Sequence, residues 1–363
     1  MAGYAIEGLL EFGQWDVLGL IHPENAKNLT RWEAIRVLGP ENARRFEIEL
    51  SPTQSVKFNA VRRYFKPAAL RRLKARILDY QPDVILLIQG NIEQGSALFS
   101  LMPGLPCPVV SYIPVPHTHA EMGAKLGRLR DLTCRSFYNK PDGFITISDT
   151  LAAQLKEYGA KGRLQVVQNG ISLERFESLP DRTSVCAEYQ LPQDAFIWAH
   201  IGRIEFKQKG QDLSLVTFKE RQKTHPNEAL VFVGSGPDSD ALLAEITGMS
   251  GVYHIPWLNE VGNVFPAING LILPSKYEGV PLVMLEALAN GIPVIGADRD
   301  GMVDWLPDDW RFDPQQAGAM DRAMDCIRKS DASLSQTLKS RVEATCALPV
   351  FKQAFNGALE DWL

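Results

Sequence analysis

Residues 277–290 read YEGVPLVMLEALAN, a mostly apolar stretch that contains two acids, Glu278 and Glu286, eight positions apart. The preceding run GLILPS (270–275) has the composition of a buried strand. Pro281 suits the first turn of a helix, and the residues after it have helical spacing. The stretch therefore predicts a strand, a loop that carries Glu278 and a helix that carries Glu286.

The separation of the two acids limits their chemistry. At about 1.5 Å of rise per helical residue they lie on the order of 8 to 12 Å apart, too far to act together on one bond as in a retaining hydrolase. They can instead hold the two ends of an elongated ligand whose anionic middle faces the helix N-terminus. A nucleotide sugar has this shape. A surface acid beside a hydrogen-bonded, partly buried acid gives the same pattern, so the stretch alone leaves both interpretations open.

The rest of the chain alternates β-branched runs with helical patterns, which is typical of parallel sheets covered on both faces. The polar segment 168–184 interrupts this alternation and is a natural hinge. We predict an α/β protein with domains 1–175 and 176–340, and a helical tail, 341–363, that packs across both. The candidate strands are 16–21, 45–50, 83–88, 108–113, 143–148, 164–168, 196–201, 229–234, 251–256, 270–275 and 292–297.

Composition narrows the class of protein. The chain has 363 residues, of which 45% are hydrophobic and 22% charged, and a net charge of -5 that gives no reason to expect nucleic acid as a partner. Its five cysteines are scattered without a C-x-x-C pair, which favours free thiols in a reducing compartment. No apolar run approaches the roughly 20 residues of a membrane span, and the N-terminus carries acids where a signal peptide is basic. These features predict a cytoplasmic protein.

Two further loops carry residues suited to a diphosphate. Gly202 and Arg203 follow the strand 196–201, and Lys209 opens the next helix, so a forked and a compact cation stand close together. Gly234 and Gly236 follow the next strand, although a Gly-x-Gly at such a place is more often only a turn. Because ligands of open α/β sheets bind beyond the carboxyl ends of the strands, we expect these loops and the two acids at one edge.

At this point the sequence resembles the retaining glycosyltransferases of family 4. The resemblance is strong over about residues 140 to 310 and weak before them. It implies the GT-B fold, in which two Rossmann-like, doubly wound domains face a central cleft that holds the active site. The segments that carry it are PDGFITISDTLAAQLKEYG (141–159), QVVQNGISLERF (165–176), HIGRIEFKQKGQDL (200–213), VFVGSGP (231–237) and LPSKYEGVPLVMLEALANGIPVIGADRDG (273–301).

The resemblance implies roles for these residues. Arg203 and Lys209 would neutralise the diphosphate, the electrostatic role of a metal ion in other transferases, so no metal or other cofactor is expected. Glu278 would contact the donor sugar, and Glu286 would accept hydrogen bonds from ribose hydroxyls. Retention is explained in this family by attack on the front face within an ion pair, without a protein nucleophile. The remaining donor-binding residues would be Gly202, Gly234, Gly236, Gly279, Val280, Pro281 and Leu282.

Other patterns are open to metal or acid-base roles. The D-x-D sequences at 238–240 and 298–300 are interpreted as turn and helix-cap acids. His117 and His119 have a spacing that can ligate zinc, but no further ligand is near in sequence. The resemblance places His117 at the end of an N-domain strand, facing the cleft near the donor sugar, with His119 as the alternative. Whether either acts as a base stays open.

The first half departs from the family pattern. AGYAIEGLLEF (2–12) resembles the first helix of the family, but no first strand and glycine-rich loop precede it, so we expect a central strand to be missing. A fragment, a misplaced start and a deletion would each give this pattern. RRYFKPAALRRLKARILDY (62–80) has seven basic residues and one acid, Asp79. It predicts an amphipathic helix that either covers the sheet or docks on an anionic membrane surface.

The sequence thus predicts a retaining, metal-independent hexosyltransferase, cytoplasmic or peripheral on the inner face of the cell membrane. It would move a sugar from a nucleoside-diphosphate sugar to a glycan or lipid-linked acceptor in cell-surface polysaccharide or lipopolysaccharide biosynthesis. One alternative is a partner protein that binds nucleotide sugars but has lost acceptor handling. Another is an epimerase of related fold, which would form product without an acceptor.

Overall fold

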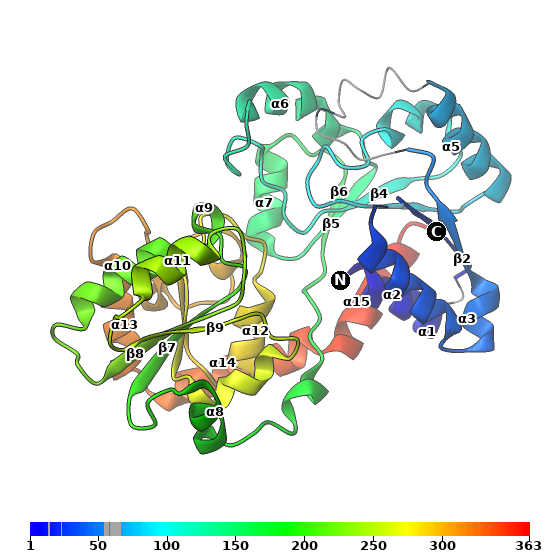
Figure 1. The fold of residues 1–363 in the computed structure, drawn as a ribbon. Helices are drawn as coiled ribbons and strands as arrows, with labels where there is room; N and C mark the ends of the chain where they lie inside the picture. The colour runs from blue at the N-terminus through cyan, green and yellow to red at the C-terminus, as the bar shows by residue number, and fades with distance from the viewer. Residues whose placement is uncertain (14, 23, 54–57, 59–66) are drawn as a thin grey trace. The chain divides into compact units, whose positions relative to one another are not determined.

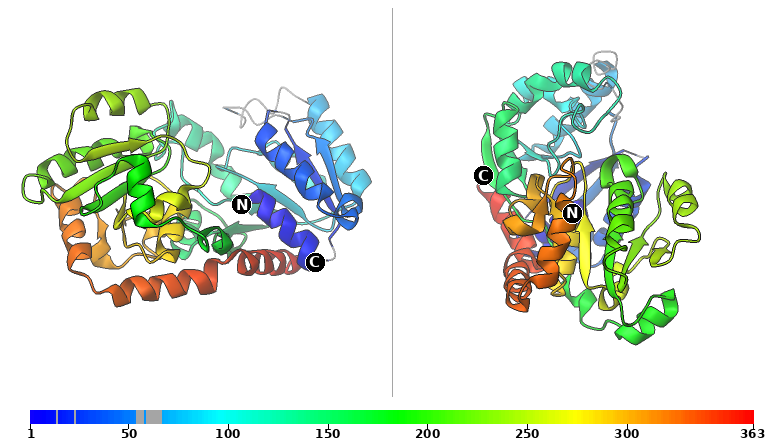
Figure 2. Two further views of the ribbon diagram at one scale, coloured as in Figure 1. Left: turned by 60° about the horizontal axis from the view of Figure 1, so that its bottom comes forward. Right: turned by 90° about the vertical axis from the view of Figure 1, so that its left-hand side faces the viewer.

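The chain forms two compact units. The structure is a computed structural model that describes residues 1–363 except 14, 23, 54–57 and 59–66. The first unit comprises Met1–Gly170 and Leu348–Leu363, and the second comprises Ile171–Ala347 (Figures 1 and 2). The predicted boundary near 175 thus lies five residues beyond the observed one, and the predicted tail is divided between the units.

The second unit contains one sheet of six parallel strands in the order β12-β11-β10-β7-β8-β9. β8, β10 and β11 are buried at every position, as expected for strands covered on both faces. The strand order reverses between β7 and β10, which is the topological switch point of an open α/β sheet. The strands are β7 (Phe196–Ile201), β8 (Glu228–Val233), β9 (Val252–Ile255), β10 (Gly270–Leu273), β11 (Val294–Ala297) and β12 (Arg311–Phe312).

Helices cover this sheet. Right-handed crossovers that run in opposite directions from the switch point place α10 and α11 on one face and α12 on the other (Figure 1). Asp181 caps α8 by accepting a hydrogen bond from the backbone of Ser184 at 2.9 Å. The helices are α8 (Arg182–Tyr189), α9 (Phe206–Lys209), α10 (Gln211–Arg221), α11 (Ser239–Ile246), α12 (Leu282–Ala289), α13 (Ala319–Lys329) and α14 (Ala332–Cys346), with 3-10 turns η5 (Leu173–Phe176), η6 (Val261–Ala267), η7 (Asp300–Met302) and η8 (Asp308–Trp310).

A buried ionic cluster joins α10, α13 and β8. The Arg221 guanidinium donates to both carboxylate oxygens of Glu228, at 2.7 and 3.0 Å. It also donates to Asp321 at 2.7 Å and to Asp325 at 2.8 Å, both on α13. Trp198 of β7 donates to the same Glu228 at 2.7 Å. Because every charge has an opposite partner, the cluster holds the sheet to its helices without an uncompensated buried ion.

The parallel strands of the first unit form two separate sheets. β1 (Val17–Ile21) pairs only with β2 (Phe46–Leu50) among the described strands. The second sheet has the order β3-β4-β5-β6. A cavity of about 1370 Å³ is lined by β1 and by β3. The strands of the second sheet are β3 (Ile85–Ile88), β4 (Val109–Tyr112), β5 (Gly143–Thr146) and β6 (Arg163–Val166).

The last helix of the chain, α15, packs against the first, α1. Lys352 donates to Glu11 at 2.7 Å, and Trp15 donates to Asn356 at 2.7 Å. A Cβ at Gly8 would lie 2.9 Å from the Lys352 Cβ, so glycine permits this close approach. The helices of this unit are α1 (Ala2–Phe12), α2 (Ala26–Val37), α3 (Pro40–Arg45), α5 (Pro67–Tyr80), α6 (Gly127–Cys134), α7 (Asp149–Glu157) and α15 (Leu348–Glu360), with 3-10 turns η2 (Leu98–Ser100), η3 (Met102–Gly104) and η4 (Arg135–Asn139).

The predicted basic helix is present as α5. Its apolar residues Leu73 and Ile77 are buried in a cluster with Val109 of β4. Its apolar face therefore covers the sheet, while Arg71 and Arg72 are exposed. The basic residues predicted at 62, 63 and 66 lie outside the described part of the chain. Among the helices that the structure describes, none is long and apolar enough to cross a membrane.

The split sheet leads to a prediction for local stability. An isolated pair of strands is marginally stable, whereas β4 and β5 each have two strand neighbours. We expect amides of β1 and β2 to exchange with solvent roughly tenfold or more faster than those of β4 and β5, because local opening costs less there. Hydrogen–deuterium exchange with mass spectrometry measures this, with β7 and β8 as an internal reference. Equal protection of all these strands would contradict it.

Candidate functional site

Glycines bring the loops after β7 and β8 into contact at the carboxyl edge of the second unit's sheet. Gly202 and Gly234 have φ angles of 151° and 138°. A Cβ at Gly234 would lie 2.1 Å from the backbone oxygen of Gly202, and one at Gly236 would lie 2.2 Å from that of Ile204. Gly234 and Gly236 therefore have a packing reason to be glycine, independent of any ligand, whereas at Gly202 the reason is the φ angle.

The loops after β7 and β10 are joined across the switch point. α9 ends at Lys209, and the Lys209 ammonium donates to a carboxylate oxygen of Glu278 in a close ion pair. The backbone of Lys276 also donates to the carbonyl of Gln208 at 2.7 Å. The Lys209 and Glu278 side chains are 23% and 11% exposed. The structure therefore brings two predicted site residues together, and an anion that binds Lys209 must compete with Glu278.

The loop after β11 supports the glutamate loop. The backbone N–H of Glu278 donates to Asp300 at 2.8 Å, and the N–H of Gly301 donates to the carbonyl of Gly279 at 3.1 Å. Asp298 pairs with Arg311 at 2.5 Å. The acids of this D-x-D sequence thus have partners within the fold, through contacts that join positions 22 and 13 apart in sequence and are not those of a turn or a helix cap. In the other D-x-D sequence, Asp238 accepts from the backbone of Phe206 at 2.8 Å.

Arg203 lies at the solvent side of this edge. Its side chain is 56% exposed, and its guanidinium lies 2.5 Å from Glu205 and 3.0 Å from Gln208.

The predicted backbone contacts Gly279, Val280, Pro281 and Leu282 form the loop that enters α12. Pro281 is the N-cap residue, one position before the helix that was predicted to include it.

Glu286 lies within α12, and its side chain is 12% exposed. Its cationic partner is Arg175 of η5, with 3.7 Å between guanidinium nitrogen and carboxylate oxygen. Burial raises the pKa of Glu286, and Arg175 opposes this effect. The sequence grouped Glu286 with Arg203 and Lys209, whereas the structure gives it Arg175. Arg175 lies 111 positions from Glu286, and one sequence does not show that their side chains meet. This pairing was therefore not predicted.

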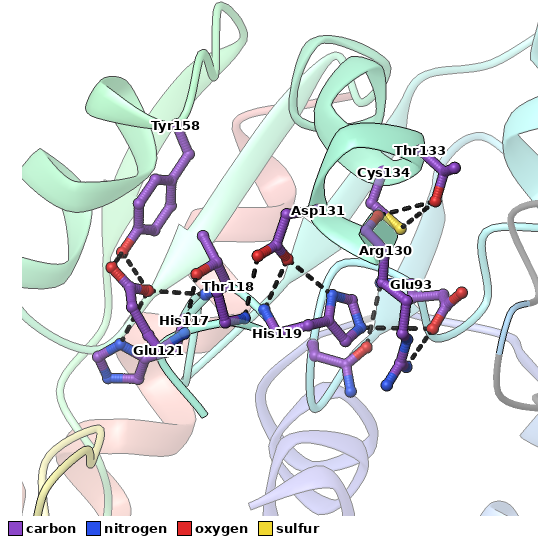
Figure 3. A network of polar contacts seen from close by, with 12 residues as sticks. Glu93, His117, Thr118, His119, Glu121, Arg130, Asp131, Thr133, Cys134 and Tyr158 are labelled. Carbon is purple, nitrogen blue, oxygen red and sulfur yellow. Dashed lines mark hydrogen bonds and ion pairs between the residues drawn. The ribbon is translucent and has the colours of Figure 1, made fainter. Parts of the chain in front are cut away.

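The two candidate histidines lie on the loop after β4 in the first unit. His119 is 1% exposed, and its Nδ1 lies 3.0 Å from Asp131 (Figure 3). Its Nε2 lies 3.3 Å from Glu93, which also forms a close ion pair with Arg130. Asp131 further accepts from the backbone of His119 at 2.7 Å and of Ala120 at 2.9 Å. These contacts give His119 a structural role in fixing the loop.

His117 has different partners. It is 5% exposed, and its Nδ1 lies 3.6 Å from Glu121, a distance of an ion pair and not of a hydrogen bond (Figure 3). Glu121 also accepts from Tyr158 at 2.8 Å and from the backbone of Thr118 at 2.8 Å. His117 first, and then Thr118 and Tyr158, lower the pKa of Glu121 to about 2 against the effect of burial. His117 belongs to the first unit, and the predicted donor-side residues belong to the second.

Solved structures define the class of this fold. Sucrose-phosphate synthase from Thermosynechococcus elongatus matches with a TM-score of 0.73 at 18% identity, over 98% of this chain and 91% of that chain. Anabaena Alr3699/HepE, in complex with UDP and glucose, matches with a TM-score of 0.70 at 14% identity, over 98% and 95%. At these identities the likeness shows the fold alone. The chain has the predicted GT-B fold, with two Rossmann-like domains of parallel α/β structure.

Sequence comparison then gives the family. A profile described as Glycosyltransferase Family 4 matches residues 26–175, and one described as Glycosyl transferases group 1 matches residues 195–327. The chain belongs to the family 4 type of glycosyltransferase, as the resemblance indicated.

Curated relatives include two named transferases. Sulfoquinovosyl transferase SQD2 of Arabidopsis thaliana is 32% identical over 253 residues, which are 66% of this chain and 47% of that protein. Lipopolysaccharide core biosynthesis glycosyltransferase LpsE of Rhizobium meliloti is 26% identical over 242 residues, 64% of this chain and 68% of that protein. The chain spans about half the length of the sulfoquinovosyl transferase.

The contact between Gly202 and Gly234 is testable by substitution. Gly234→Ala adds a methyl group against a backbone oxygen, and we expect the free energy of unfolding to fall by about 2 to 5 kcal/mol. Gly291→Ala is the matched control, because Gly291 also has a positive φ, 72°, but no atom lies within 4 Å of its added Cβ. It should cost about 1 kcal/mol. Urea unfolding measures both, and similar losses would contradict the steric explanation.

The low pKa of Glu121 predicts a pH dependence. A group whose pKa is lowered on folding stabilises the protein above its unfolded pKa and loses this effect as pH falls toward its folded pKa. Glu121→Gln should therefore lower stability at pH 7, by about 0.5 to 1 kcal/mol because the side chain is half-exposed. The difference from the unsubstituted protein should shrink below about pH 4.5. Urea midpoints between pH 7 and pH 3 test this, with exposed Glu157→Gln as a control that shows no such trend.

Proposed function

We propose that this protein is a retaining glycosyltransferase that moves a sugar from a nucleoside-diphosphate sugar to a glycan or lipid-linked acceptor. The observation that carries the proposal is the Lys209–Glu278 pair at the switch point, with Glu286 a short way along the helix that follows. A cation and two acids at this edge suit a ligand with an anionic middle and hydroxyl-bearing ends. The HepE structures in complex with UDP, UDP and glucose, and UDP-glucose support a donor of this chemical class.

In the proposed reaction, the bond between the anomeric carbon and the β-phosphate oxygen breaks, and its electron pair stays with the phosphate. The acceptor hydroxyl oxygen bonds to the anomeric carbon on the same face, and its proton passes to the departing phosphate. Arg203 and Lys209 stabilise the negative charge that develops on the diphosphate, which is an electrostatic contribution that needs no metal ion. Glu278 orients the sugar once the phosphate has taken its place at Lys209.

For the first unit, we assign to His117 a role in handling the acceptor, with Glu121 as its acidic partner. The exposed Arg71 and Arg72 of α5 suit a peripheral position on anionic lipid, where a lipid-linked acceptor would be met. All five cysteines are free, which is typical of a reducing compartment such as the cytoplasm. A relative named for lipopolysaccharide core biosynthesis supports cell-surface glycan assembly as the pathway.

Thermal stabilisation by nucleoside diphosphates and their sugars tests the donor site. A ligand at a hundred times its dissociation constant stabilises a protein by about 2.7 kcal/mol, which is readily seen as a shift in Tm. We expect Glu286→Ala and Lys209→Ala each to remove the shift, because each deletes a contact to the donor. Lys219→Ala and Glu245→Ala are matched controls, since these two side chains are exposed and pair with each other on α10 and α11.

Three outcomes would count against the proposal. An unchanged shift in both Glu286→Ala and Lys209→Ala would contradict the placement of the donor. Donor binding without release of nucleoside diphosphate, in the presence of suitable acceptors, would favour a partner protein that binds nucleotide sugars without turnover. Product formed without an acceptor would indicate an epimerase.

A further inference from the structure

One arginine in the second unit lies between two acids. Arg175, on η5, donates to the Glu260 carboxylate from two nitrogens, at 2.9 and 3.0 Å. A third nitrogen of the same guanidinium lies 3.7 Å from the Glu286 carboxylate. All three residues belong to the second unit.

The two acids differ in burial. The Glu260 side chain is 60% exposed, whereas that of Glu286 is 12% exposed. Water therefore solvates the charge of Glu260 but little of the charge of Glu286, and a buried carboxylate is costly unless it is paired. Among the ion pairs of the described residues, the cation that pairs with Glu286 is Arg175.

We propose that Arg175 is a positioning residue of the donor site, which keeps the Glu286 carboxylate ionised and oriented to accept hydrogen bonds from the ribose hydroxyls. This inference rests on the proposed function, since it takes the ligand of Glu286 to be the ribose of a nucleoside diphosphate. It adds Arg175 and Glu260 to the residues that control donor binding.

The geometry explains why this arrangement suits a hydroxyl-binding acid. At 3.7 Å Arg175 is too far to form a hydrogen bond with Glu286, so it attracts the charge without using the carboxylate lone pairs. An ionised carboxylate accepts on both oxygens, whereas a protonated one loses part of this capacity to its own O–H. Hydrogen bonds to the charged form are also the stronger ones. Two N–H groups of Arg175 donate to one carboxylate oxygen of Glu260, and this contact fixes the guanidinium at its distance from Glu286.

The neighbours of Glu286 act on its protonation in opposite directions. Burial raises the pKa of Glu286, Arg175 lowers it, and Glu260 raises it. Removing the Arg175 charge should therefore move the titration of Glu286 to higher pH, and removing the Glu260 charge should move it to lower pH. If Arg175 and Glu260 merely supported the fold, their substitution would not shift the titration of Glu286 in opposite directions.

The first measurement uses the ligand-free protein. With glutamate labelled at 13Cδ, the Glu286 resonance is identified by its loss in Glu286→Gln and is followed from pH 4 to pH 8. We expect its midpoint to rise by about 0.5 to 1 pH unit in Arg175→Gln and to fall in Glu260→Gln. Lys219→Gln, which removes an exposed cation on α10, should leave the midpoint unchanged.

The second measurement is the affinity for UDP, used as the probe, between pH 5 and pH 8. The decline in affinity toward low pH should follow the same two shifts, so Arg175→Gln should bind UDP more weakly than the unsubstituted protein, by a factor that approaches about 3- to 10-fold at the acid end of the range. The titration of UDP itself is common to all variants and cancels in this comparison. With 2′-deoxy-UDP the dependence on the variants should be smaller, because one ribose hydroxyl is absent.

Each result has a distinct meaning. Shifts in the same direction, or no shift, in the 13C titration would overturn the inference even if UDP binds. Opposite shifts without a matching change in UDP affinity would overturn the role of Arg175 in donor binding. If no nucleoside diphosphate binds the unsubstituted protein, the proposed donor site itself is wrong.

Discussion

The second unit depends on how closely two loops approach each other at the carboxyl edge of its sheet. Gly234 lies so near Gly202 that even a methyl group would collide with a main-chain oxygen. With these loops in contact, the chain after β7 forms the single turn of α9. This turn places Lys209 at the switch point, where its ammonium contacts Glu278. A backbone constraint therefore determines where the charged side chains lie.

The two ends of the proposed donor site differ in how their charged side chains are paired. At one end, the Lys209–Glu278 pair is a direct contact that a diphosphate must replace, so binding there is an exchange of one anion for another. At the other end, Arg175 stands off from Glu286 and is fixed by Glu260, so that pair can persist while hydroxyls bind. A basic and an acidic side chain thus give an exchangeable contact in one place and a lasting one in the other, because the distances differ.

Much of the fold could be predicted from the sequence. All eleven predicted strands are present, with ends displaced by no more than two residues, because buried parallel strands are short apolar runs between turn residues. β12 was missed since Arg311–Phe312 is too short to leave a pattern. The tail was predicted to pack across both domains, but the residue at which it passes from one unit to the other depends on tertiary contacts such as Lys352 with Glu11.

The candidate site was predictable to a different extent. That Lys209 and Glu278 lie at one sheet edge follows from motifs at neighbouring strand ends, whereas their direct pairing was not predicted. The roles of His117 and His119 could not be separated by sequence, because they depend on which carboxylates surround each ring. Asp131 and Glu93 bracket His119, whereas Glu121 faces His117. Arg175 lies in one of the segments that carry the family resemblance, but its pairing with Glu286 depends on how the chain folds.

The divided sheet of the first unit has a consequence for the behaviour of the protein in solution. β1 and β3 both line the cavity between the two sheets, and among the described strands each pairs on one side alone. The other side of such a strand offers main-chain donors and acceptors to any extended polypeptide that meets it, whatever its sequence. Self-association of this protein by strand addition would therefore be governed by main-chain geometry, and raising the ionic strength would do little to prevent it.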